Sequence, residues 1–452
     1  MPFVPANLTF GIIGPYAFFK NLVYDSALVN TSSLDLNLLA HKYSDLSNLN
    51  SPGWWFWNQL GAMIAIEDIN NDKSILPHTQ IDLKLFNEHL VKGSSPGYAV
   101  QVVQTINEQH EDVVALHGGF DTSTSLYSAA IASVYEIPFC GATQYSSKFM
   151  DKHNYPYFFE TYPYSGGTTA LISLLQHWNV TRLAYISSDG IDSDAAAIKQ
   201  IQKAGIKIVA HILISGYVED VDSPQIAASL KQTDARYMFM STAAITAAHV
   251  FFSLAKMNSS VGPDFVWITN TGLVVSPDVN ATQAYGSDYY KKSQGMILVT
   301  GSVPDDPFFA EETERLARII YDKFGVQVAT GDLLYMTNFF SAYDCVRLLG
   351  HGIANVLKRL NYSLESLDHL RNALNYTAFI NTGYHGVMGI TNETLKLTEF
   401  GDIQLQFGHY YLNMDPSLSN YMPFAYTNAN GSITLDPLSP VIFIDGLNTE
   451  YV

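Results

Sequence analysis

The sequence has few basic residues and few charges of either sign, and both scarcities exclude classes of protein. Its 24 lysines and arginines stand against 42 acidic residues, which gives a formal net charge of -18. Nucleic acids and anionic membrane surfaces require a basic face, so neither is an expected partner. Only 15% of the residues are charged and 47% are apolar, which excludes a disordered tail. A chain of 452 residues suits two folded domains.

Cysteine is scarce as well. The two cysteines, Cys140 and Cys345, are too few for a disulfide framework or a metal site. Cys140 ends an apolar strand and Cys345 lies within an apolar helix, so we expect two buried thiols. We expect neither a metal nor a cofactor.

Catalytic motifs are almost absent. The sequence contains no GxGxxG, P-loop, HExxH or CxxC pattern. Residues Gly93–Gly97 fit the Gly-x-Ser-x-Gly pattern of hydrolases. However, Pro96 follows the serine directly and suits the first position of a helix better than a strained nucleophile elbow. His117, at a strand end, and His385, beside a glycine, are expected to be packing residues. We therefore expect a binding protein and no enzyme.

Long apolar runs are missing, whereas glycosylation sequons are abundant. No run reaches 18 apolar residues, so no membrane span is predicted, and no signal peptide precedes the first strand. We expect a signal peptide and any anchor to lie outside this sequence. Nine Asn-x-Ser/Thr sequons occur, against about four expected by chance from the composition. The excess favours a eukaryotic protein that is secreted or lies on the extracellular face of the plasma membrane. The candidate glycosylation sites are Asn7, Asn30, Asn179, Asn258, Asn280, Asn361, Asn375, Asn392 and Asn430.

Apolar strands alternate with amphipathic helices along most of the chain. One series begins with a strand at Leu8–Ile13, and a second begins with a strand at Arg182–Ile186. This alternation predicts an α/β protein with parallel sheets. A further helix is predicted over Asp332–Leu357, and strands are predicted from Gly389 onward. Residues 16–52 form a long polar stretch, whose length favours a functional role or mobility.

Two successive apolar strands, Val113–Leu116 and Ile137–Cys140, are followed by turns rich in hydroxyl groups. Ligands bind outside the carboxyl ends of strands in an open parallel sheet. A helix N-terminus that carries hydroxyl groups also suits an anionic group such as a carboxylate. We therefore predict a site for a small molecule that includes Asp121, Thr122, Ser123, Thr143 and Gln144.

An acidic turn follows the strand Arg182–Ile186. It contains Asp189, Asp192 and Asp194, whose carboxylates suit an ammonium group or sugar hydroxyls. The alternative is a helix start, where acids complement the helix dipole. The turn lacks the glycine and the remaining ligands of a calcium loop.

Residues Trp54–Pro77 (WWFWNQLGAMIAIEDINNDKSILP) and the nearby IDLKLFNEH resemble the extracellular ligand-binding domain of class C G-protein-coupled receptors, most of all the type B GABA receptor. The resemblance covers nearly the whole chain apart from residues 16–52. It continues in register through Thr233–Arg236, Val266–Thr269, Ser341–Asp344 and Gly386–Gly389.

The resemblance implies a fold and a function. The fold would be that of periplasmic binding proteins of type I, with two Rossmann-like lobes joined by three crossovers. Lobe 1 would comprise residues 1–160 and 302–381, and lobe 2 residues 161–301 and 382–452. Such a Venus flytrap domain binds a ligand in its cleft, closes, and signals to an effector across the membrane. It would dimerise through lobe 1, by the helices Pro96–Asn107 and Ser123–Val134. The alternatives are a soluble protein that delivers a solute to a transporter, and a partner subunit that binds no ligand.

By the same resemblance, the lobe-1 contacts of the receptor are partly present. The serine pair that holds the ligand carboxylate falls on Asp121 and Thr122, and the next serine cluster falls on Thr143 and Gln144. The pocket histidine falls on Tyr162. The pocket tryptophan falls on Trp54 or Trp55, for which ordinary packing is the alternative.

The contacts that close the cleft differ more. The lobe-2 tyrosine of the receptor falls on Ala243, its lobe-2 tryptophan near Gly272, and the glutamate that pairs with the ligand amine on Asn338. Loss of a charge partner in a buried site costs on the order of 2–5 kcal/mol. We therefore predict that GABA is not the ligand.

Overall fold

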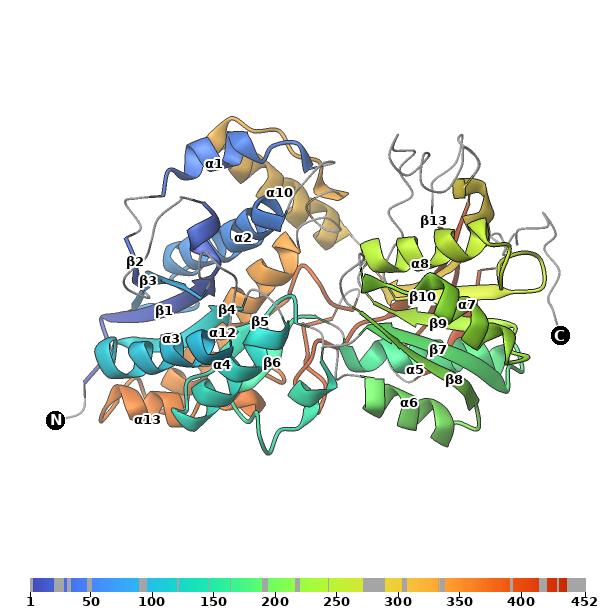
Figure 1. Ribbon diagram of the computed structural model, residues 1–452. Helices are drawn as coiled ribbons and strands as arrows, with labels where there is room; N and C mark the ends of the chain where they lie inside the picture. The colour runs from blue at the N-terminus through green and yellow to red at the C-terminus, as the bar shows by residue number, and fades with distance from the viewer. Residues whose placement is uncertain are drawn as a thin grey trace. The chain divides into compact units, whose positions relative to one another are not determined.

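The computed structural model divides the chain into two compact units (Figure 1). The first unit comprises Met1–Pro163 and Val303–Gln404, and the second comprises Tyr164–Ser302 and Leu405–Val452. The structure describes residues 3–19, 28–30, 34–46, 51–88, 96–119, 122–144, 146–162, 164–188, 194–215, 220–242, 244–270, 289–302, 307–331, 333, 338–390, 393–413, 421–428 and 431–436.

The first unit is built on a six-stranded sheet with the order β2-β3-β1-β4-β5-β6. Its strands are parallel except for β2, which pairs antiparallel with β3. The strands are β1 (Asn7–Gly14), β2 (Leu28–Val29), β3 (Gln80–Asn87), β4 (Val113–Gly118), β5 (Phe139–Gly141) and β6 (Phe158–Glu160). The predicted strand Leu8–Ile13 is thus confirmed as β1, and all its residues after Asn7 are buried.

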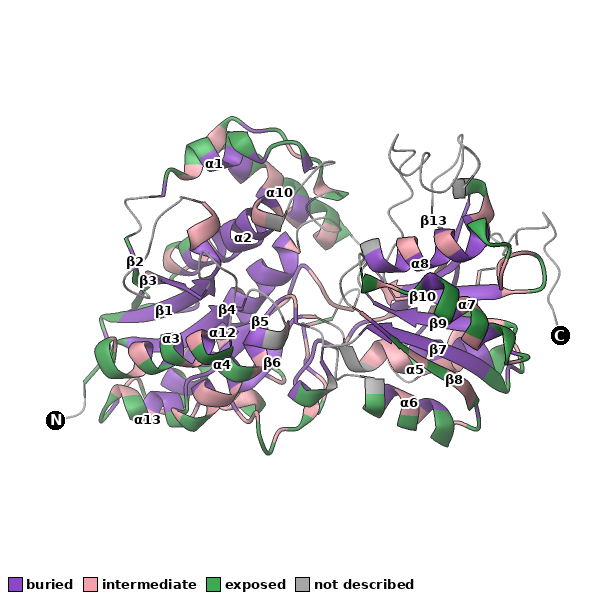
Figure 2. Ribbon diagram, viewed as in Figure 1, coloured by how far each residue is buried: buried purple, intermediate pink, exposed green. Residues whose placement is uncertain are grey.

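Helices cover this sheet. They are α1 (Leu36–Lys42), α2 (Ser51–Asn71), α3 (Pro96–Gln109), α4 (Thr122–Val134), α10 (Pro307–Phe324), α12 (Phe339–Arg359) and α13 (Leu367–Asn372), with short 3-10 helices η1 (Tyr16–Phe18), η4 (Ser147–Met150) and η7 (Tyr376–Ala378). Figure 2 shows α12 largely buried, whereas α3 and α4 each present an exposed face. The predicted helix Asp332–Leu357 is interrupted: residues 330, 331 and 333 are helical, but α12 begins at Phe339. Asn338, directly before it, has a left-handed backbone geometry (φ 50°) that a right-handed helix cannot contain.

The polar stretch at residues 16–52 contributes to the core of the first unit where it is described. The Trp57 indole donates a hydrogen bond to the Tyr43 carbonyl oxygen, at 2.8 Å. The ring of Phe56 lies 5.9 Å from that of Tyr43 and 6.2 Å from that of Phe19, measured between centroids. These contacts dock α1 and η1 against α2.

A buried carboxylate explains why the motifs Ser341–Asp344 and Gly386–Gly389 occur together. Asp344 on α12 accepts hydrogen bonds from the backbone N–H of Val387 (2.9 Å) and of Met388 (2.6 Å), and from the Tyr384 hydroxyl (2.7 Å). Burial raises the pKa of Asp344 to about 7, although the three hydrogen bonds oppose the rise. A side chain at Gly386 would stand 3.0 Å from an Asp344 carboxylate oxygen, so this position requires glycine.

The segment that contains Gly386–Gly389 also bears on the expected boundary between the two units. The third crossover was expected near residue 381, but residues 382–404 belong to the first unit. Besides the bonds to Asp344, the backbone N–H of Leu397 donates to the Ile380 carbonyl (2.9 Å) and that of Leu395 to the Tyr384 carbonyl (2.7 Å). These pairings hold the segment to the first unit until Gln404.

The second unit is built on an eight-stranded sheet with the order β14-β13-β12-β11-β10-β9-β7-β8. Strands β7 to β11 are parallel, and β12, β13 and β14 continue the sheet antiparallel. The strands are β7 (Arg182–Ser188), β8 (Lys207–Ile214), β9 (Tyr237–Ser241), β10 (Val266–Thr269), β11 (Ile297–Gly301), β12 (Phe407–Leu412), β13 (Tyr421–Thr427) and β14 (Ile433–Leu435). The helices are α5 (Tyr164–His177), α6 (Asp194–Lys203), α7 (Ser223–Lys231) and α8 (Ala244–Lys256), with the 3-10 helix η6 (Tyr289–Ser293).

The predicted class, an α/β protein with two Rossmann-like lobes of the type I periplasmic-binding-protein fold, is confirmed by these two sheets. The strands expected from Gly389 onward start only at Phe407, because residues 393–406 form isolated bridges within the first unit and at its boundary. Among the described helices, none combines the length and apolar character that a membrane span requires.

Candidate functional site

The carboxyl ends of the parallel strands in the first unit meet at one edge of the sheet. Gly14 at the end of β1 pairs with Asn87 at the end of β3, and Ile13 pairs with Gly118 at the end of β4. Gly141, which ends β5, pairs with Glu160, which ends β6. The polar segments that follow these strands therefore lie along a common edge, where ligands bind in open parallel sheets.

The turn after β4 is built on two glycines with positive φ, Gly118 (124°) and Gly119 (91°). A side chain at Gly118 would overlap the Ile13 carbonyl, and one at Gly119 would overlap the Ser125 hydroxyl. This tight turn leads into α4, whose first residue, Thr122, is half-buried. Asp121 and the side chain of Ser123 lie outside the described residues.

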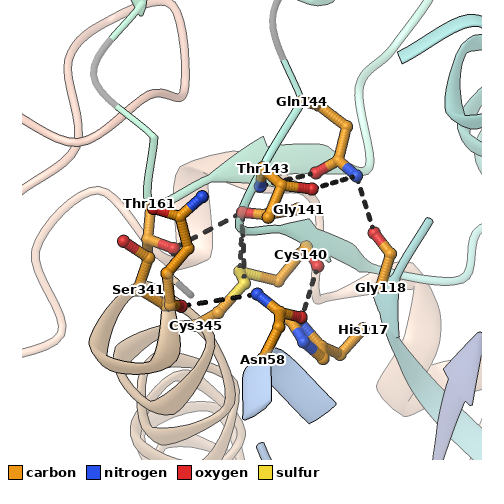
Figure 3. Close-up of a disulfide and its surroundings, with 11 residues drawn as sticks. Asn58, His117, Gly118, Cys140, Gly141, Thr143, Gln144, Thr161, Ser341 and Cys345 are labelled. Atoms are coloured by element: carbon orange, nitrogen blue, oxygen red, sulfur yellow. Dashed lines mark hydrogen bonds between the residues drawn. A yellow bond between two sulfur atoms is a disulfide. The ribbon is translucent and has the colours of Figure 1, made fainter. Parts of the chain in front are cut away.

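Gln144 ties this turn to the end of the neighbouring strand (Figure 3). Its amide nitrogen lies 3.0 Å from the carbonyl oxygens of both Gly118 and Gly119 and 3.2 Å from the Ser125 hydroxyl. The side chain is fully buried, so the protein itself uses its donors. Gln144 thus positions the edge, and Thr143 is half-buried with its hydroxyl 3.3 Å from the Gln144 amide nitrogen.

The two predicted pocket tryptophans lie in the first turn of α2. Their ring centroids are 5.3 Å apart, but Trp55 is 1% exposed and Trp54 is half-buried. A side chain on Gly14 would stand 2.6 Å from the Trp55 indole nitrogen. Trp55 therefore packs against the end of β1, and Trp54 is the more accessible of the pair.

Tyr162 follows β6 at the same edge. Its side chain is half-buried, and desolvation, reinforced by the nearby Glu160, raises the pKa of its phenol to about 12. The phenol stays protonated at neutral pH and can donate a hydrogen bond to a ligand.

His117 adds a neutral imidazole below this edge. The side chain is 1% exposed, and burial lowers its pKa to about 4. Its Nδ1 donates to the Cys140 carbonyl oxygen at 3.1 Å, which leaves Nε2 as an acceptor. The expectation that His117 packs within the protein agrees with this burial.

The expectation of two thiols is wrong, because Cys140 and Cys345 form a disulfide (Figure 3). Their Cα atoms are 5.8 Å apart although 205 positions separate them in the sequence. Packing of α12 against the end of β5 brings the two together, and the Thr161 hydroxyl donates to the Ser341 carbonyl oxygen (2.7 Å) between the same regions. The disulfide thus fixes the start of α12 to the candidate site.

Asn338 stands at the amino end of α12, at the position that the resemblance assigns to the amine-binding glutamate. It is half-buried, and its carbonyl oxygen accepts from the side-chain amide of Asn58 at 3.4 Å. Asn58 is fully buried, and its side-chain oxygen has no hydrogen-bond partner within the described ranges. Asn58 and Asn338 therefore place amide groups at the amino end of α12.

The second sheet has its own row of small polar groups at its carboxyl edge. Strand β7 ends at Ser187 and Ser188, β9 ends at Ser241, and β10 ends at Thr269. The Ser187 hydroxyl lies 3.0 Å from His211 Nε2, and the Ser241 hydroxyl lies 3.4 Å from the Asn270 amide nitrogen. The sequence prediction overlooked these hydroxyl residues and chose the acidic turn instead. The same kind of pattern, hydroxyl residues at the ends of apolar strands, had been used to predict the site in the first sheet. Asp189, Asp192, the Asp194 side chain, Ala243 and Gly272 lie outside the described residues.

The sequons that are described have accessible asparagines. Asn375 is half-buried, and the others are exposed: Asn7, Asn30, Asn179, Asn258 and Asn361. The remaining three, at Asn280, Asn392 and Asn430, lie outside the described residues. Over the described ranges, no group of three or more His, Cys, Asp and Glu side chains has the arrangement of a metal site.

Comparison with known proteins identifies one family. The model of the receptor family ligand binding region matches residues 59–407, which is more than half of the chain. No curated protein matches the sequence significantly.

Proposed function

Since the chain belongs to the family of receptor ligand-binding regions, we propose that it is the extracellular ligand-binding domain of a membrane receptor. It binds a small polar metabolite at the carboxyl edge of the first sheet and signals by closure of its lobes. The family match carries this proposal, and the polar edge supplies the binding groups. Trp54, Thr122, Thr143 and Tyr162 are the contacts, and Gln144 holds Thr143 and the turn at Gly118 and Gly119 in place.

Two features support an extracellular location. Disulfides form and persist in oxidising compartments, and Cys140–Cys345 is a disulfide. The six described sequon asparagines are all accessible to a glycosyl group. The sequons favour a receptor ectodomain over a soluble solute-binding protein of a transport system, which is the alternative within the same family. The disulfide suits both, since the bacterial periplasm is oxidising as well.

The ligand is not GABA in the pose of the type B receptor. Asn338 supplies an amide where an amine ligand would need a carboxylate, and its neighbour Asn58 is also neutral. A zwitterionic ligand would therefore lose an ion pair on this side of the site.

A thermal-shift panel of amino acids, amines, nucleosides and sugars tests ligand binding. A ligand at 100 times its dissociation constant stabilises the folded state by about 2.7 kcal/mol. We expect one class to raise the melting temperature, and we expect Thr122→Ala and Tyr162→Ala to abolish that rise. Thr105→Ala, which removes an exposed threonine hydroxyl on α3, is the matched control and keeps it. Binding retained in both site variants would refute the site, and no response to any compound would favour a partner subunit that binds no ligand.

We also propose that the domain forms a dimer through α3 and α4. On α4, Tyr127 is 47% exposed and Val134 is 71% exposed, and their spacing of seven residues places them on one face. Val134→Glu should convert a dimer into a monomer in sedimentation, whereas Leu213→Glu, at a 63% exposed leucine of the second unit, should not. A wild-type monomer at all concentrations would contradict the dimer.

A further inference from the structure

Two segments that lead out of the first unit run side by side. Glu160, the last residue of β6, forms a parallel bridge with Asp402, and its backbone N–H donates to the Gly401 carbonyl oxygen at 2.8 Å. The first segment passes into the second unit after Pro163, and the other does so after Gln404. The bridge therefore joins two crossovers close to the points where they leave the unit.

The bridge also places two carboxyl groups in the protein interior. Glu160 is 2% exposed and Asp402 is 1% exposed. The Thr398 hydroxyl donates to one carboxylate oxygen of Asp402. By contrast, Glu160 Oε2 has no hydrogen-bond partner over the described parts of the chain. The bridge pairs the two residues, and two buried carboxylates at paired positions repel each other when both are ionised, while burial adds to the cost.

The nearest cation, Lys152, does not neutralise the pair. Its ammonium group donates to the Phe158 carbonyl oxygen at 2.8 Å and lies 5.2 Å from the centre of the Tyr376 ring. Among the described ion pairs, none joins Lys152 to Glu160. Burial and repulsion by Asp402 outweigh the attraction of Lys152, and they raise the pKa of Glu160 well above its ordinary value.

The other titratable groups around the pair keep their charge states near neutral pH. Burial lowers the pKa of Lys152 to about 8, while Glu160, Asp402 and the exposed Asp151 favour its cation. Tyr162, next to Glu160, has its pKa raised to about 12 and stays neutral. Glu399, in the turn before Asp402, is exposed. Glu160 and Lys152 are therefore the groups whose protonation changes in this cluster, and Lys152 loses its proton only around its pKa of about 8.

We propose that Glu160 and Asp402 share one proton and form a proton-dependent latch between the two crossovers. With the proton bound, the pair carries a single negative charge, and the protonated carboxyl can donate a hydrogen bond within the cluster. When the proton leaves, two like charges remain buried, and the segments 158–162 and 398–404 separate more easily. The latch makes the mobility of the crossovers depend on pH, and it does not rest on the identity or existence of a ligand.

Hydrogen exchange of the whole chain at pH 5.5, 7.0 and 8.5, corrected for the intrinsic rates, tests the latch. In the wild type, protection of peptides covering 158–162 and 398–404 should fall as the pH rises. Glu160→Gln cannot ionise at this position and should keep its protection between pH 5.5 and 7.0, where Lys152 still holds its proton. Glu399→Gln, in the exposed part of the same turn, should behave like the wild type.

Thermal melting gives a second readout with a defined sign. Because the folded state raises the pKa of Glu160, the folded state holds this proton more tightly than the unfolded state. That stabilisation is complete below the ordinary glutamate pKa of about 4.3 and is lost as the pH rises toward the raised value. The melting temperature of the wild type should therefore fall relative to that of Glu160→Gln as the pH rises above about 4.3.

Asp402→Asn changes the other carboxyl group of the pair, and it is used for the same measurements if Glu160→Gln does not fold. Because repulsion by Asp402 is one of the causes that raise the pKa of Glu160, removal of the Asp402 charge should lower this pKa and shift the loss of protection to lower pH. The loss should also be smaller, since ionised Glu160 then meets no second negative charge. The latch is overturned if Glu160→Gln, or Asp402→Asn in its place, keeps the pH dependence of the wild type in both measurements.

Discussion

The two units of the molecule stabilise the carboxyl edges of their sheets in different ways. In the first unit, side chains distant in sequence hold the edge: the Cys140–Cys345 disulfide, the Thr161–Ser341 hydrogen bond and the Gln144 network. In the second unit, small hydroxyl residues such as Ser188 and Ser241 end strands that are already paired on both sides. The first edge therefore depends on a few buried polar links, and the second depends on its backbone ladder.

The same contrast extends into the cores. In the first unit, the guanidinium of Arg371 is 3% exposed and donates to the carbonyl oxygens of Val113 (3.0 Å) and Glu111 (2.8 Å). Asp344 holds a loop through three bonds. In the second unit, the ion pair Arg182–Asp234 is exposed, and an apolar cluster around Trp267 forms the core. Single polar substitutions should therefore damage the first unit more than the second.

Removal of the disulfide should have the largest effect. Cys140→Ala with Cys345→Ala should lower the free energy of unfolding of the first unit by about 2–5 kcal/mol, since the unfolded chain regains the freedom of a long loop. Hydrogen exchange followed by mass spectrometry should show the loss in peptides of α12 and β5. Peptides of β7 and β9 should keep their protection, and an equal loss in both units would break the comparison.

Replacement of Asp344 should rank next. Asp344→Ala leaves two buried N–H groups and the Tyr384 hydroxyl without their acceptor, which should cost about 3 kcal/mol. Its counterpart, Asp234→Ala in the second unit, removes only an exposed ion pair and should cost less than about 1 kcal/mol. Urea unfolding of both variants measures the difference, and similar losses would show that burial of the polar link does not matter.

Local pattern was enough to predict most of the fold. Strand β1 and helix α6 follow from apolar periodicity, and Gly205 (φ 88°) ends the turn after α6 as its sequence indicates. Such signals lie within about ten residues of the element they specify, because propensity and patterning act locally. The break before α12 was missed because a left-handed Asn338 gives no periodic signal.

The links that hold the candidate site could not be predicted in the same way. The Cys140–Cys345 pairing spans 205 positions and depends on how α12 packs on β5. Gln144 was predicted to face a ligand, but the direction of its side chain is set by the tight turn at Gly118 on another strand. The hydroxyl residues Ser188 and Ser241 could have been identified from the sequence as candidate binding groups, but the prediction named the acidic turn at residues 189–194 instead.

The smallest expected effect compares one amide from each edge. Gln144→Ala removes the donor that joins the Gly118 and Gly119 carbonyls to Ser125, and should cost about 1–3 kcal/mol because buried acceptors lose their partner. Asn270→Ala, at a half-buried side chain bonded to Ser241 at 3.4 Å, should cost about 1 kcal/mol or less. Urea unfolding measures both. If Asn270→Ala costs as much as Gln144→Ala, the second edge also depends on side-chain links, and the distinction between a cross-linked and a ladder-supported edge fails.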